Sequence, residues 1–258
     1  MRIQTAPGVE LELRVEGDRA APAVVLLHGF PESAHSWRHQ VGPLVEAGYR
    51  VVVPDQRGYA GSSVPAAVAD YAARHLTADV VAILDALGIG SADIVGHDWG
   101  ALVAWHMGFF HPERCRSIVG VSVPFNVPNS PPIQHFRKVH GDRFYYLNHF
   151  QRLGLAECEL EADPERFLRA IWWAASAAAG APPAPALPAE GTSAAEAFEA
   201  MAGGRRKELP AWLSDQEAAV YVEQFRRSGF FGPVSWYRNL DTNYHDTRNL
   251  SLERFSMP

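Results

Sequence analysis

An aspartate between two glycines is the first residue in this 258-residue chain whose setting suggests chemistry. Residues Gly96–Gly100 read G-H-D-W-G, with Asp98 at the centre. A β-branched run, Ala92–Val95, precedes them, and a helix-type run, Ala101–Met107, follows. A strand, a sharp turn and a helix in this order present the central side chain at the end of the strand. Glycines on both sides let the chain turn tightly, because they have no Cβ. The pattern predicts that Asp98 is a nucleophile.

The choice of aspartate restricts the chemistry. A serine at this place would need a base to remove its proton, whereas a carboxylate is already ionised at neutral pH. The N-terminus of the following helix stabilises that charge. A carboxylate attacks esters and amides poorly, but it can displace a leaving group from an sp³ carbon. Asp98 therefore indicates an enzyme-bound ester formed from an epoxide or an alkyl halide. The alternative is an aspartate that only caps a helix, which is common.

The elements that must position Asp98 alternate between strands and helices. Strands are predicted at 9–15, 23–27, 50–53, 92–95 and 117–123, and helices at 36–47, 71–87 and 101–107. This order predicts an α/β fold with a mostly parallel sheet and helices on both faces. Reactive groups in such sheets lie at the carboxyl ends of the strands, where His28, Asp55 and Asp98 all fall.

After Pro124 the strand pattern stops, and residues 130–245 have the pattern of helices and loops. One helix is expected at 163–175 and another at 214–228, with Ser214 as its N-cap and Glu217 three residues later. The alanine- and proline-rich stretch 174–193 is typical of a loop. We expect a helical cap over the strand ends. The predicted domains are a core at 1–128, a cap at 129–246 and a return segment at 247–258.

Five motifs in order carry a family resemblance. They are H-G-F-P-E-S at His28–Ser33, D-Q-R-G-Y at Asp55–Tyr59, the Asp98 turn, and two cap segments at Tyr145–Gln151 and Gly232–Asn239. With these motifs the chain resembles an epoxide hydrolase of the α/β-hydrolase fold superfamily. The resemblance implies an α/β-hydrolase core with an inserted cap, a small apolar epoxide and water as substrates, and a vicinal diol as product.

The resemblance also implies roles for residues around Asp98. Tyr146 and Tyr237 would hydrogen-bond the epoxide oxygen, since a phenol with a pKa of about 10 stays protonated at neutral pH. Tyr145 is the rival of Tyr146 for this role. The backbone N–H groups of Phe30 and Trp99 would form an oxyanion hole for the second step, in which water attacks the ester.

Four neighbouring residues are expected to shape loops or to pack rather than to react. His28, Gly29 and Pro31 would shape the loop that carries Phe30. His97 precedes the nucleophile, but at such a turn its side chain should point away, which favours packing over a role as base.

The triad implied by the resemblance is incomplete in this sequence. An acid and a histidine base should follow the cap, but the chain stops at Pro258 and its last histidine is His245. A complete fold would need on the order of 55 further residues. Without an acid and a base, we expect the chain to open an epoxide but not to hydrolyse the ester. The strand at 117–123 would also be an unprotected edge that favours pairing or aggregation.

Composition excludes several classes of protein. The formal charge of −6 argues against a nucleic-acid partner, and no run of about 18 apolar residues could span a membrane. The start of the chain does not resemble a signal peptide. Cys115 and Cys158 do not define a disulfide framework, and no metal-ligand spacing or cofactor motif is present. These features favour a cytoplasmic enzyme without metal or cofactor.

Two alternatives remain open from the sequence. A haloalkane or haloacid dehalogenase could use the same Asp98, but a departing halide needs N–H donors rather than phenols, so the paired tyrosines favour an epoxide. The second alternative is a non-catalytic homologue that binds a small apolar molecule unchanged. Its support is the missing acid and base.

Overall fold

A sheet with strand order β1-β2-β4-β3-β5-β6 forms the centre of the molecule. The computed structural model describes residues 1–176, 191–203, 208–250 and 255. The strands are β1 (Arg2–Ala6), β2 (Val9–Glu16), β3 (Ala23–Leu27), β4 (Arg50–Pro54), β5 (Ala92–His97) and β6 (Cys115–Val121). Strands β4, β3, β5 and β6 are parallel to one another. Strand β2 pairs antiparallel with β4 on one side and with β1 on the other. The predicted mostly parallel sheet is therefore confirmed.

Strand β1 was not expected from the sequence. Of its five residues, Ile3 alone is buried, so it lacks the apolar alternation that marks β2. By contrast, every residue of β3 and of β4 is buried. Continuous burial is typical of parallel strands that helices cover on both faces. It explains why these two strands could be recognised as short apolar runs.

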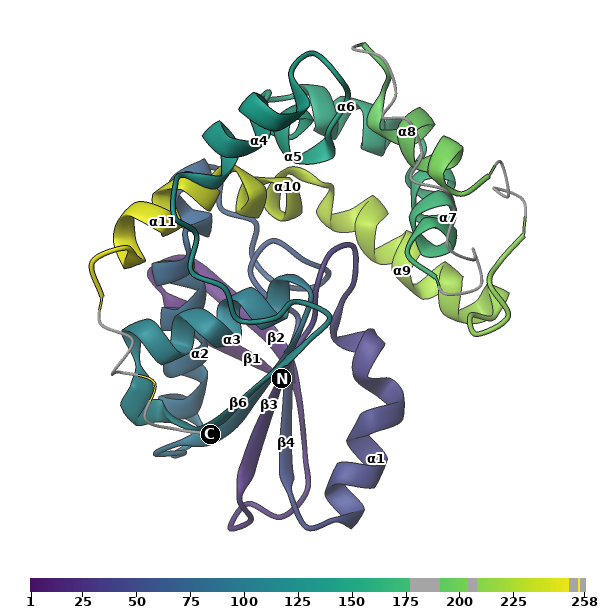
Figure 1. Ribbon diagram of the computed structural model, residues 1–258. Coiled ribbons are helices and arrows are strands. Elements are labelled where there is room, and N and C mark those ends of the chain that lie inside the picture. The colour runs from purple at the N-terminus through teal and green to yellow at the C-terminus, as the bar shows by residue number, and fades with distance from the viewer. Residues whose placement is uncertain (177–190, 204–207, 251–254, 256–258) are drawn as a thin grey trace.

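Helices cover the two faces of the sheet unequally (Figure 1). Helix α1 (Arg38–Glu46) lies on one face, and α2 (Ala73–Ala86) and α3 (Trp99–Phe110) lie on the other. The alternation along β3 follows this division, because Val24 and Leu26 pack with the α1 side whereas Val25 and Leu27 join the larger core. Three short 3₁₀ helices connect these elements: η1 (Ala34–Trp37), η2 (Val68–Tyr71) and η3 (Pro112–Arg114).

The described residues after β6 form helices that arch over the carboxyl ends of the strands (Figure 1). They are α4 (Pro132–His140), α5 (Tyr146–His149), α6 (Leu155–Ala162), α7 (Pro164–Ala174), α8 (Ala194–Met201), α9 (Asp215–Ser228), α10 (Phe231–Arg238) and α11 (Leu240–Thr247). The predicted boundaries of core, cap and return segment remain a prediction. Most of the predicted loop at 174–193 lies outside the described residues, which resume at 191.

Reciprocal caps fix the starts of two helices in this arch. Ser214 accepts a hydrogen bond from the Glu217 backbone while the Glu217 carboxylate accepts from Ser214. The predicted N-terminus of α9 is thus confirmed. Ser193 and Glu196 make the same exchange at the start of α8, which was not predicted. Each such reciprocal cap satisfies two backbone N–H groups that are otherwise left unpaired at the start of a helix.

Strand β6 lies at the edge of the described sheet, with β5 beside it. Its Val119 and Val121 side chains are exposed. The edge position expected for this strand is therefore confirmed. No helix in the described ranges is long and apolar enough to cross a membrane.

Candidate active site

Asp98 lies at the junction of β5 and α3 with a backbone φ of 51° and ψ of −117°. A positive φ is strained for any residue other than glycine and persists only where the surroundings impose it. Gly96 and Gly100 make the turn possible. A Cβ on Gly96 would lie 2.0 Å from the Gly100 carbonyl oxygen, and one on Gly100 would lie 2.1 Å from that of Leu27. Both glycines are therefore required by space.

Two backbone N–H groups meet the Asp98 carboxylate. The Phe30 N–H donates to Oδ1 at 2.8 Å, and the Trp99 N–H also binds the carboxylate. Burial raises the pKa of Asp98 above its ordinary value, and the two N–H bonds offset part of that rise. The residues predicted as oxyanion donors are thus in contact with Asp98. Their role in a reaction remains a prediction.

The loop that carries Phe30 is fixed by its neighbours. His28 is fully buried, and its Nε2 accepts a hydrogen bond from the Gln56 N–H at 3.0 Å while Nδ1 lies 3.0 Å from the Gly29 carbonyl oxygen. Burial lowers the pKa of His28 to about 4, so the ring is neutral at pH 7 and can accept. A Cβ on Gly29 would lie 2.4 Å from the Asp98 Cβ, and the buried Pro31 follows Phe30. These contacts hold the loop against Asp98.

A cavity of about 690 Å³ lies between Asp98 and the helical arch. Phe30, Asp98 and Ser122 line it together with residues of the helical arch such as Trp172 and Phe198. The lining combines aromatic and aliphatic side chains with a polar group of residues, namely Glu32, Ser36, Arg38, His39, Gln40, His97, Asp98 and Ser122. A cavity that pairs apolar surface with polar groups is typical of a site for a small organic molecule. Within the described ranges, no group of three or more His, Cys, Asp or Glu side chains is arranged to hold a metal ion.

Tyr237 on α10 lines the cavity together with Asp98. Its side chain is 5% exposed, and its ring packs edge-on against Trp99 and Phe30 with centroids 5.0 Å and 5.3 Å away. Burial raises the pKa of Tyr237 well above its ordinary value, and the negative charge of Asp98 adds to the rise. The phenol therefore stays protonated and can donate its hydrogen.

Tyr146 at the start of α5 lines the same cavity, with its ring centroid 5.8 Å from that of Tyr237. Burial raises its pKa as well. Its rival Tyr145 instead stacks on His140 at 3.9 Å and is not among the cavity-lining residues. The structure thus brings together Asp98, Tyr146 and Tyr237, the three side chains that were predicted to react.

A histidine–glutamate pair in the cavity was missed from the sequence. His97 Nδ1 lies 3.0 Å from Glu32 Oε1, and Glu32 Oε2 accepts a hydrogen bond from the Gly29 N–H at 2.8 Å. His97 does more than pack, because its ring pairs with Glu32 and both residues line the cavity together with Asp98. That it is not the base remains a prediction. Glu32 raises the pKa of His97 by its hydrogen bond and charge. The available signal was Glu32 itself, an acid three residues after Gly29 in the H-G-F-P-E motif.

Comparison with known proteins agrees with this geometry. Residues 22–156 match the family model of the alpha/beta hydrolase fold. The chain is 41% identical over 260 residues to Epoxide hydrolase A of Mycobacterium tuberculosis, covering all of this chain and 79% of that protein. Epoxide hydrolase B of the same organism is 38% identical and covered to 72%, with 89% of this chain matched. The chain belongs to the epoxide hydrolase family.

Solved structures support the same assignment. The crystal structure of Epoxide Hydrolase A from Mycobacterium thermoresistibile superposes with a TM-score of 0.87 at 40% identity, covering 96% of this chain and 76% of that one. An epoxide hydrolase from an endophytic Streptomyces gives a TM-score of 0.85 at 33% identity, covering 96% and 74%. Both the expected family and the α/β-hydrolase fold are confirmed, and the chain is an enzyme of that family.

Proposed function

We propose that this epoxide hydrolase opens a small apolar epoxide through a covalent ester on Asp98. The observation that carries the proposal is one cavity in which the Asp98 carboxylate faces the phenols of Tyr146 and Tyr237. Oδ2 of Asp98 attacks a ring carbon, and the bond between that carbon and the epoxide oxygen breaks. The two phenols hydrogen-bond the departing oxygen, and one of them gives it a proton.

The second step returns the enzyme to its starting state. Water attacks the Asp98 carbonyl carbon and the ester bond breaks. One proton of that water completes the vicinal diol on the oxygen that was Oδ2, and the other restores the phenol. The base for this step is not among the residues assigned to the site, so the Asp98 ester is the product expected where no base acts. Negative charge develops on Oδ1, which the Phe30 N–H already binds at 2.8 Å. Donors fixed before the reaction stabilise such charge without reorganisation, and one donor is typically responsible for about 10² to 10³ in rate. Phe30 and Trp99 are the oxyanion hole in this proposal.

The pair of phenols favours this substrate class over an alkyl halide. A halide leaves as a stable anion and needs no proton, whereas an alkoxide does. The raised pKa values of Tyr146 and Tyr237 keep both phenols in the donating form. The relatives that match over most of their length are named as epoxide hydrolases. No contact in the described residues specifically favours a dehalogenase or a non-catalytic binder.

Intact-protein mass spectrometry after incubation with styrene oxide tests the proposal. We expect either an adduct of one epoxide mass that maps to Asp98, or diol formation with one ¹⁸O entering Asp98 in a single turnover in labelled water. Asp98→Asn should give neither product. The matched control is Asp85→Asn on α2, whose carboxylate is exposed and 2.8 Å from Arg114. Binding of the epoxide with no adduct and no diol would favour the non-catalytic alternative, and release of bromide from a matched alkyl bromide alone would favour the dehalogenase.

A further inference from the structure

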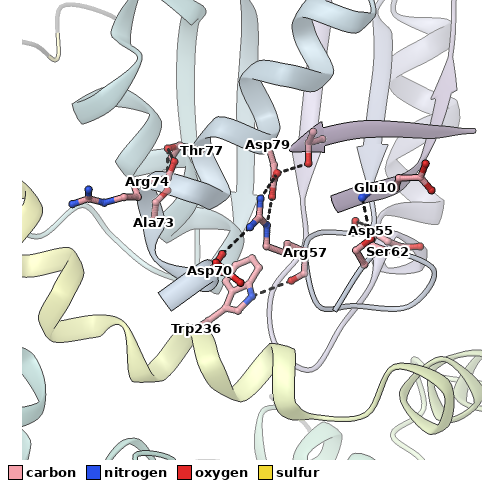
Figure 2. A network of polar contacts seen from close by, with 12 residues as sticks. Glu10, Asp55, Arg57, Ser62, Asp70, Ala73, Arg74, Thr77, Asp79 and Trp236 are labelled. Carbon is pink, nitrogen blue, oxygen red and sulfur yellow. Dashed lines mark hydrogen bonds and ion pairs between the residues drawn. The ribbon is translucent and has the colours of Figure 1, made fainter. Parts of the chain in front are cut away.

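Trp236, the residue before Tyr237 in α10, binds the core rather than the cavity. Its ring is fully buried, and its indole Nε1 donates to the carbonyl oxygen of Arg57 at 3.1 Å (Figure 2). The ring also packs edge-on against Tyr59 and Trp99, with centroids 5.5 Å and 5.7 Å away. Of these two consecutive residues of α10, Trp236 thus contacts the loop after β4, whereas Tyr237 lines the cavity that holds Asp98.

Arg57 is itself held firmly. Its Nε and Nη2 donate to the two carboxylate oxygens of Asp79 on α2 at 2.8 Å and 2.7 Å, and both side chains are 4% exposed. Its Nη1 donates to the carbonyl oxygen of Asp70 at 2.9 Å (Figure 2). Parallel bonds between a guanidinium and a carboxylate fix direction as well as distance. The carbonyl that receives Trp236 therefore belongs to a residue that cannot move easily.

The backbones of the same two segments touch at a pair of glycines. A Cβ on Gly232, in the first turn of α10, would lie 2.6 Å from the Cα of Gly58. A Cβ on Gly58 would lie 2.9 Å from the Cα of Gly232. Contact distances below 3.0 Å leave no room for any side chain, so this close approach of the two segments depends on glycine at both positions. It sets how closely α10 can lie to the core.

We propose that Trp236, Gly232 and the Arg57–Gly58 backbone are positioning residues for Tyr237. They place the Tyr237 phenol relative to Asp98 by tying α10 to the core, and their effect on ring opening passes through Tyr237. This inference rests on the proposed function, in which Tyr237 donates to the epoxide oxygen. A displacement of about 1 Å in such a group can reduce a rate by about 10².

Two variants test the positioning role. Trp236→Phe keeps an aromatic ring and removes the donor, and Gly232→Ala forces α10 away from Gly58. We expect each to slow Asp98 alkylation by styrene oxide about 10- to 100-fold in single-turnover assays, with the dissociation constant of the diol changed less than about threefold. The controls are Trp105→Phe, which removes an indole bond between α3 and the Val123 carbonyl oxygen, and Gly42→Ala, where a Cβ would meet nothing within 4 Å.

The decisive readout combines these changes with the loss of the Tyr237 hydroxyl. In a Tyr237→Phe background, Trp236→Phe should slow alkylation no further than about twofold, because the residue it positions no longer donates. An equal slowing in both backgrounds would overturn the inference, since it would indicate general damage. A crystal structure of Trp236→Phe gives an independent check. The Tyr237 ring should move relative to Asp98, and an unmoved ring overturns the inference. This check does not depend on adduct formation. The absence of an adduct in every protein, the wild type included, would count against the proposed function.

Discussion

Helices α10 and α5 each bring one tyrosine to the same cavity, but they are held in different ways. Tyr237 follows a residue bound to the core, and Asn239 at the end of α10 donates to the Val68 carbonyl oxygen at 2.7 Å. Tyr146 lies on a helix of four residues, and its ring packs against Phe150, Phe198 and its two fellow tyrosines. The position of Tyr237 is thus set by contacts with the segment after β4, whereas that of Tyr146 is set by packing within the helical arch.

This difference suggests a division of tasks. A helix as short as α5 is not stable by itself, so the place of Tyr146 depends on the packing of the surrounding cap. The place of Tyr237 depends on Arg57, which the buried Asp79 anchors. We therefore expect Tyr237 to set the rate of ring opening, and Tyr146 to adapt to the shape of the substrate. Four measurements can break or sharpen this contrast.

The largest expected effect comes from removing each hydroxyl. Tyr237→Phe should slow Asp98 alkylation about 10²- to 10³-fold, and Tyr146→Phe about 10- to 10²-fold, since a positioned general acid contributes on the order of 10² to 10⁴. Stopped incubations with styrene oxide followed by mass spectrometry give both rates. Tyr244→Phe, on α11, is the matched control because Tyr244 is not among the cavity-lining residues. An equal or larger loss in Tyr146→Phe would contradict the contrast.

We expect the ionisation of Asp98 to control how the alkylation rate depends on pH, so both tyrosine variants should show the same pH dependence. Burial raises the pKa of Asp98, and only the ionised carboxylate attacks. The rate should therefore fall about tenfold per pH unit below that pKa, beginning at higher pH than for an exposed aspartate near 3.9. Rates measured between pH 4 and 8 check this. If the acid limb of Tyr237→Phe lay at a different pH from that of the wild type, another group would control the attack. The same would follow if the rate did not fall at any pH above 4.

A smaller effect is expected from loosening the packing of Phe198 against Tyr146 in the cavity lining. Phe198 is buried with its ring 6.0 Å from Tyr146, so Phe198→Leu should slow alkylation about three- to tenfold and reduce the unfolding free energy by roughly 1–2 kcal/mol. Phe230→Leu is the control, because the Phe230 ring contacts Phe167 and Phe225 rather than the tyrosines. If Phe230→Leu slowed alkylation as much, cap stability in general would explain the result.

The smallest effect concerns the link between the two tyrosines. Gln151 Nε2 donates to the Leu147 carbonyl oxygen at 2.8 Å and to that of Tyr237 at 3.1 Å. Gln151→Met keeps the length of the side chain and removes both bonds, each worth about 0.5–1.5 kcal/mol. We expect alkylation to slow about two- to threefold, and the effects of the two Tyr→Phe changes to become closer to additive. Unchanged coupling in a double-mutant cycle would rule out this link.

Features encoded in neighbouring residues could be predicted from the sequence, and those made by distant partners could not. The turn at Asp98 and the cap at Ser214 each depend on residues within a few positions, so both were recognisable. The pairing of Arg57 with Asp79 and the donation from Trp236 to Arg57 join segments far apart in sequence. No local pattern specifies such partners, because they meet only once the tertiary fold has formed. Glu32 stands in a recognised motif, but its partner His97 lies 65 residues away, so the pairing of the two was overlooked.

The hydrogen bond from Phe30 makes the two oxygens of Asp98 unequal. In the full proposed reaction, Oδ2 departs with the diol and an oxygen from water replaces it, while Oδ1 stays with its donor. If the carboxylate does not rotate between cycles, repeated turnover in ¹⁸O-labelled water replaces one oxygen of Asp98 and never the second. The first diol then carries oxygen that the ribosome built into the protein, and every later diol carries oxygen from the solvent of the preceding cycle.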